Sequence, residues 1–103
     1  MLDKGAVIDS VERYTEAVTK EFSPSAVVLF GSHVNGNPNE GSDIDVAVIF
    51  SGFSGDWLET SARLWGLKED IDLDIEPHLL DSMEDKSGFV KHVLKTGQII
   101  YQA

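Results

Sequence analysis

The residues of this chain that most clearly suggest a chemical function are a Gly-Ser pair and an Asp-Ile-Asp sequence. Gly31 and Ser32 follow an apolar run, and after ten intervening residues Asp43 and Asp45 open a second one. Residues i and i+2 of a strand point to the same face, so the two carboxylates point the same way. Mg²⁺ commonly binds one or two such carboxylates together with substrate phosphates, and free N–H groups at a glycine turn can hold those phosphates. The pattern therefore predicts metal-dependent nucleotide chemistry.

A second acidic segment could supply a third carboxylate. Residues 71–76 alternate apolar and acidic side chains, which predicts a strand that Pro77 closes. Asp72, Asp74 and Glu76 would then share one face of this strand. Aligned like charges repel, so a cation or a basic partner is expected nearby. One of these carboxylates could complete a two-metal clamp with the Asp-Ile-Asp pair.

The remaining segments form the elements that position these side chains. Apolar residues spaced three or four positions apart predict amphipathic helices, and short apolar or alternating runs predict strands. The expected helices cover residues 6–22, 57–68 and 89–96, and the expected strands cover residues 26–30, 43–50, 71–76 and 98–101. These elements predict an α/β (α+β) fold in a single domain over residues 1–103. The fold would contain a small mixed sheet of three or four strands flanked by helices, which we expect on one side of the sheet.

Composition and charge narrow the classes of function. The 103 residues include no cysteine, and 18 acidic against 8 basic side chains give a net charge of −10. This charge disfavours direct binding of nucleic acid or anionic membranes, and it favours a basic protein partner or metal ions, although acidity also serves solubility. No apolar run approaches the roughly 20 residues of a membrane span, and five acidic residues among the first 22 are unlike a signal peptide. We therefore expect a cytoplasmic protein without disulfides.

The sequence GSHVNGNPNEGSDIDVAVIF, followed later by IDLDIEP, resembles the signature of the minimal nucleotidyltransferases, members of the DNA polymerase β-like superfamily. In that signature a Gly-Ser pair, ten residues and Asp-x-Asp precede a third carboxylate on a later strand. The match covers residues 27–77 and is specific as a whole, whereas Asp-x-Asp alone would be weak. The resemblance implies a nucleotidyltransferase fold and its strand order, which periodicity does not supply.

The resemblance also implies roles for individual residues. Gly31 and Ser32 would bind the triphosphate of ATP or of another nucleoside triphosphate. Three carboxylates would be catalytic and would ligate the metal: Asp43, Asp45 and Asp74. Asp72 is the alternative third carboxylate, because it shares the predicted face of Asp74. The implied cofactor is Mg²⁺ in a two-metal site, with Mn²⁺ as an alternative.

Family members of this size resemble antitoxins that pair with helical HEPN ribonucleases. The resemblance implies an Mg²⁺-dependent nucleotidyltransferase that transfers AMP from ATP to a hydroxyl, such as a tyrosine of a HEPN-type toxin, within a hetero-oligomer. One position departs from the pattern, because Asn35 stands where many relatives carry Arg or Lys. This departure motivates an alternative, in which the protein is a catalytically weak binding module that neutralises a basic partner ribonuclease by masking it.

Overall fold

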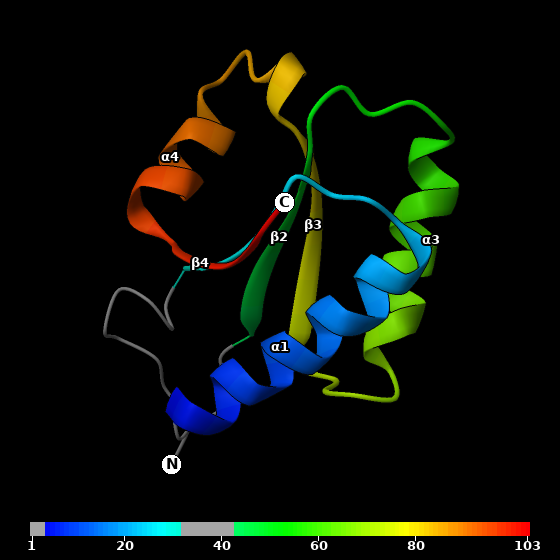
Figure 1. Cartoon of the computed structure of the whole chain (residues 1–103), viewed down its shortest axis with the longest axis vertical. Helices are drawn as coiled ribbons and strands as arrows, with labels where there is room; N and C mark the ends of the chain where they lie inside the picture. The colour runs from blue at the N-terminus through cyan, green and yellow to red at the C-terminus, as the bar shows by residue number, and fades with distance from the viewer. Residues whose placement is uncertain (1–3, 32–42) are drawn as a thin grey trace.

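A four-stranded mixed sheet forms the centre of the computed structural model, which describes residues 4–31 and 43–103 (Figure 1). The strand order is β3-β2-β1-β4. β1 pairs antiparallel with both β2 and β4, whereas β2 pairs parallel with β3. The strands are β1 (Ala26–Phe30), β2 (Ile44–Phe50), β3 (Ile75–Asp81) and β4 (Gln98–Gln102). The architecture confirms the predicted α+β class and the predicted mixed sheet.

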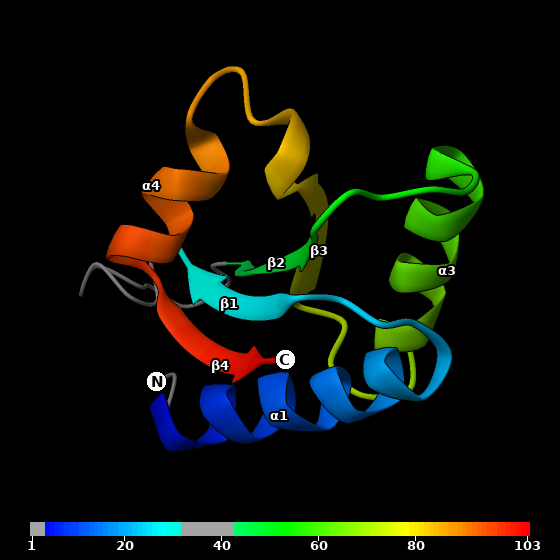
Figure 2. The same cartoon turned by 45° about the horizontal axis from the view of Figure 1, so that its top comes forward.

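Helices cover both faces of the sheet, as Figure 2 shows. Within the described residues the α-helices are α1 (Lys4–Glu21), α3 (Trp57–Lys68) and α4 (Phe89–Thr96), and a short 3-10 helix spans Ser82–Glu84. One face packs against α1 and α3 in a core that includes Val11, Val46 and Leu64. The opposite face packs against α4 through Ala47, Ile49 and Val93.

The expectation that the helices lie on one side of the sheet is wrong. Strand alternation places Ala47 and Ile49 on the face that also carries Asp45. These apolar side chains need cover, and the amphipathic helix α4 provides it through Val90 and Val93. Asp45 does not belong to this apolar cluster and stays partly exposed, so a polar site can form at its end of the face.

The third strand begins later than the alternation of residues 71–76 predicts. Residues 69–74 form turns and a short connection, and the strand itself runs over Ile75–Asp81. The Asp72 carboxylate accepts a hydrogen bond from the Asp74 backbone N–H at 3.0 Å, a local bond that favours a turn over a strand. Pro77 does not close the strand but lies within it, which is compatible with the position of β3 at the edge of the sheet.

In the described residues, no helix is both long enough and apolar enough to cross a membrane. The long helix α1 instead joins the core of the domain. The hydroxyl of its buried Tyr14 donates a hydrogen bond of 2.8 Å to the Leu64 carbonyl of α3. This bond fixes the two helices against each other on the face opposite Asp45.

Candidate functional site

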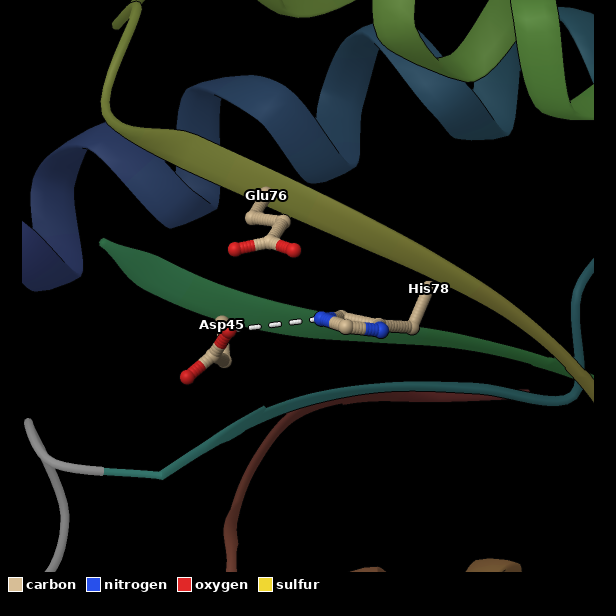
Figure 3. Close-up of side chains that lie close together, drawn as sticks. All are labelled: Asp45, Glu76 and His78. Carbon is tan, nitrogen blue, oxygen red and sulfur yellow. Dashed lines mark hydrogen bonds and ion pairs between the residues drawn. The ribbon is translucent and has the colours of Figure 1, made fainter.

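The parallel pairing of β2 and β3 brings three potential metal ligands together. In the strand register Asp45 lies opposite Glu76, and Ala47 lies opposite His78. Because alternate residues share a face, Asp45, Glu76 and His78 all project from the α4 side of the sheet (Figure 3). One ligand atom from each of the three lies within 4.8 Å of the others.

His78 is held close to Asp45. Its Nε2 lies 3.3 Å from the Asp45 Oδ1, and both side chains are partly exposed, at 33% and 26%. The His78 ring also makes an edge-to-face contact with Phe30 of β1, with ring centroids 5.1 Å apart. Two neighbouring strands therefore fix the imidazole at the rim of the site.

The Glu76 carboxyl lies among other carboxyl groups. Its pKa is raised, first by partial burial and then by a hydrogen bond with the Asp43 carboxyl. The negative charges of Asp45 and Asp43 raise this pKa further, and His78 opposes them. The fold therefore concentrates negative charge at one place, which a bound cation would relieve.

Gly31 closes the site on the β1 side. Its φ of +82° belongs to the left-handed region, which favours glycine. A Cβ at this position would collide with the Asp45 carboxylate. Gly31 is thus required both by the backbone conformation and by the close approach of Asp45.

The structure unites some of the predicted site residues and separates others. It places Asp45 beside Glu76, and Asp43 within hydrogen-bonding reach of the same Glu76 carboxyl. Gly31 borders the group, whereas Ser32 and Asn35 lie outside the described residues.

Asp72 and Asp74 do not join this group. The exposed Asp74 precedes β3, and its backbone carbonyl accepts a hydrogen bond of 2.8 Å from Ile44. Asp72 stabilises the preceding turn. The residue that faces Asp45 across the two strands is Glu76, because the strand starts at Ile75 rather than at residue 71.

The sequence offers Glu76 only as one of three acidic residues on a predicted strand face, with no firm role, and it gives His78 none. A signal for them is present, because the alternation continues past Pro77. Ile75, Pro77 and Leu79 are buried, while Glu76 and His78 are partly exposed between them. If proline is allowed in an edge strand, this pattern predicts a strand with its polar face at Glu76 and His78.

The donor set fits a divalent cation. Carboxylate oxygens suit hard cations such as Mg²⁺ and Mn²⁺, and imidazole nitrogen is a common ligand of transition metals. In the described part of the chain, the ion pairs that involve arginine lie elsewhere, between Arg13 and Asp9 and between Arg63 and Glu21. No lysine or arginine in that part forms an ion pair with the carboxylates of the site, so their charge is available for a cation.

Solved structures with the same fold include nucleotidyltransferase-like proteins. A candidate nucleotidyltransferase from Sulfolobus solfataricus superposes with a TM-score of 0.71 at 20% identity, over 96% of this chain and 83% of that chain. A toxin–antitoxin structure with AMP-PNP gives a TM-score of 0.66 at 21% identity, over 89% of this chain and 73% of that one. A mutant of the toxin–antitoxin pair MntA-HpeT gives 0.65 at 16% identity, over 99% of this chain and 75% of that one.

Sequence comparison identifies the family. A search of curated proteins finds no match. The family model described as polymerase beta, nucleotidyltransferase matches residues 12–103, which include every residue of the candidate site. Both the fold and the family resemblance predicted from the sequence are thus confirmed, and the chain belongs to the polymerase beta nucleotidyltransferase family.

Proposed function

We propose that this protein is a metal-dependent nucleotidyltransferase that transfers AMP from ATP to a hydroxyl group. The observation that carries the proposal is the convergence of Asp43, Asp45 and Glu76 at one end of two paired strands, in a chain of this family. Asp43 and Asp45 keep the roles of catalytic metal ligands that the resemblance implies. For the third carboxylate, we propose Glu76 in place of Asp74, because Glu76 faces Asp45.

In the proposed reaction, the acceptor hydroxyl attacks the α-phosphorus of ATP. A new bond forms between the hydroxyl oxygen and the α-phosphorus. The bond between the α-phosphorus and the oxygen that bridges it to the β-phosphorus breaks, and pyrophosphate and a proton leave. Divalent cations, Mg²⁺ or Mn²⁺, supply charge stabilisation of the attacking and leaving oxygens when bound. The three carboxylates would hold the cations, and the backbone of Gly31 would contact the triphosphate. Ser32 remains a proposed triphosphate contact.

For the acceptor, we propose a tyrosine of a HEPN-type toxin, which would make this protein the antitoxin of a hetero-oligomeric pair. Two of the similar folds come from toxin–antitoxin structures, and one of these contains AMP-PNP. The net charge of −10 favours docking to a basic, RNA-binding partner rather than to nucleic acid. An ATP-dependent reaction of this kind would take place in the cytoplasm.

A second candidate function is neutralisation by masking, without transfer. A hollow of about 380 Å³ between β3, α3 and α4 favours it, because apolar side chains line the hollow and carboxylates border it. Its apolar residues include Trp57 and Phe89, and its acidic residues are Asp81, Glu84 and Asp85. Such a surface suits a partner segment that combines apolar and basic side chains.

An assay with labelled ATP distinguishes nucleotide transfer from neutralisation by masking. The protein is incubated with its co-purified partner and with ATP labelled at either the α- or the γ-phosphate. The proposal predicts that the partner retains α-label but not γ-label, and that the Asp43→Asn, Asp45→Asn double variant abolishes this labelling. The matched control, Asp74→Asn, retains it. Undiminished α-labelling by the double variant would refute the proposal. Neutralisation by the double variant at a stoichiometric ratio, without any labelling by the wild type, would support masking instead.

A further inference from the structure

His78 places a nitrogen donor beside the carboxylates of the candidate site. The resemblance assigns the metals to carboxylates alone, and the proposed reaction gives His78 no role. His78 nevertheless lies on the same strand face as Glu76 and within reach of Asp45 (Figure 3). Its position in the site therefore needs an explanation.

The distance between His78 and Asp45 fits two ligands of one cation. Most N–H···O hydrogen bonds are about 2.9–3.0 Å long, and the separation of Nε2 from Oδ1 is 3.3 Å. With metal–ligand bonds of about 2.1 Å, two adjacent ligands of a tetrahedral or octahedral cation lie roughly 3.0–3.4 Å apart. The ligand atoms of Asp45, Glu76 and His78 all lie within 4.8 Å of one another, so a small contraction would close them around one ion.

The imidazole is also held in place before any cation binds. The Nε2 of His78 lies 3.3 Å from the Asp45 Oδ1 on β2, and the His78 ring contacts the ring of Phe30 on β1. These contacts restrict the ring from two sides, while its exposed fraction of 33% leaves it accessible. Little side-chain entropy would be lost when its nitrogen binds a metal.

We propose that His78 is a nitrogen ligand of the cation held by Asp45 and Glu76, and that it shifts the preference of this site from Mg²⁺ toward Mn²⁺ and Zn²⁺. The chemical reason is that Mg²⁺ favours oxygen ligands, whereas imidazole binds transition metals well. The inference rests on the proposed function, because it concerns the cation of the same site. It assigns to this chain a metal selectivity that three carboxylates alone would not give.

Calorimetric titration of the full chain with Mn²⁺ and with Mg²⁺ tests this inference. For the wild type, we expect Mn²⁺ to bind at least about tenfold more tightly than Mg²⁺. His78→Gln should weaken Mn²⁺ binding by about 10–100-fold and Mg²⁺ binding by less than about threefold. His92→Gln, a change on the exposed surface of α4, is the matched control and should leave both affinities unchanged.

A second measurement follows the imidazole itself and does not depend on a folded variant. In ¹⁵N spectra of the three histidine rings, the resonances of His78 should shift with one equivalent of Zn²⁺, while those of His92 should not. Equal weakening of Mn²⁺ and Mg²⁺ by His78→Gln would make His78 a positioning residue for Asp45 and overturn the inference. Unchanged affinities, an unshifted His78 ring, or no metal binding by the wild type would also overturn it.

The transfer reaction of the wild type in Mg²⁺ is measured in parallel. Its absence would count against the proposed function alone, because the ratio of metal affinities and the ring resonances report on His78 without any nucleotide.

Discussion

The two ends of β3 hold carboxylates in opposite environments. At the end of the strand, Asp81 accepts three backbone hydrogen bonds of 2.9 Å, which lower its pKa. The donors are the N–H groups of Gly52, Phe53 and Met83. Near the start, Glu76 lies beside the carboxyl groups of Asp43 and Asp45, and burial and these neighbours raise its pKa. The fold therefore gives Asp81 hydrogen-bond donors for its charge, whereas it places Glu76 next to groups of the same charge.

This difference is the one expected between a structural carboxylate and a carboxylate of the proposed site. Asp81 stabilises the bend after β2, because ionised oxygens accept N–H groups that would otherwise lack partners. Glu76 gains no comparable partner within the described residues and lies close to like charges. Natural folds break local rules of this kind mainly at functional sites. The contrast supports the proposal that the start of β3 is arranged for a cation and its end for stability.

The largest effect on stability is expected from alanine at Gly31, with Gly52 as its matched control. Both glycines have a positive φ, of 82° and 80°, so alanine at either position should cost about 1 kcal/mol in backbone strain. Only at Gly31 would the added Cβ collide with Asp45, whereas at Gly52 the nearest atom lies 3.8 Å away. Gly31→Ala should therefore lower the free energy of unfolding by about 2–4 kcal/mol in total.

Urea denaturation of both glycine variants measures this difference. Equal destabilisation of the two would show that Asp45 does not lie against Gly31. The claim that Gly31 is required by the site, and not only by its turn, would then fail.

A smaller and pH-dependent effect is expected at Asp81. Its folded pKa lies below the usual value of 3.8, so its stabilising contribution is present above pH 3.8 and is lost as the pH falls through the folded pKa. Asp81→Asn should lower the melting temperature at pH 7. The difference from the wild type should shrink as the pH drops below about 4. Thermal melts between pH 3 and pH 7 measure it, and a difference independent of pH would contradict the structural role of the charge.

The smallest effect is expected from Glu76→Gln in metal-free protein, and it has the opposite sign. The raised pKa of Glu76 means that its favourable contribution is fully present below the unfolded pKa of 4.5 and is lost as the pH rises through the folded value. Removing this charge at pH 7 should slightly raise the melting temperature in the presence of a chelator. A lower melting temperature would show that Glu76, like Asp81, stabilises the fold.

Sequence patterns predict the part of the candidate site on β2 better than the part on β3. The strict alternation from Asp43 to Phe50 determines that Asp45 shares a face with Ala47, and the structure agrees. Before β3, Asp72 and Asp74 continue an alternation that looks like a strand, but the Asp74 backbone N–H donates a hydrogen bond to the Asp72 carboxylate and closes a turn. Periodicity carries no information on such a bond, so it predicts the start of the strand four residues too early.

The sequence pattern also does not predict which face of the sheet each helix covers. The amphipathic character of α4 predicts an apolar face, and the structure buries Val90 and Val93. Which side of the sheet receives them depends on the path of the chain after β3, which no local pattern specifies. The same tertiary arrangement leaves Glu76 and His78 beside Asp45.

The proposed carboxylate site is tested most directly by calorimetric binding of Mg²⁺ by Glu76→Gln and by Asp74→Asn, each compared with the wild type. Both variants remove one carboxylate charge from the same stretch of chain, but only Glu76 lies in the cluster with Asp45. We expect Glu76→Gln to weaken Mg²⁺ binding at least about tenfold, while Asp74→Asn leaves it nearly unchanged. Weak binding by Asp74→Asn together with wild-type binding by Glu76→Gln would contradict the proposed site.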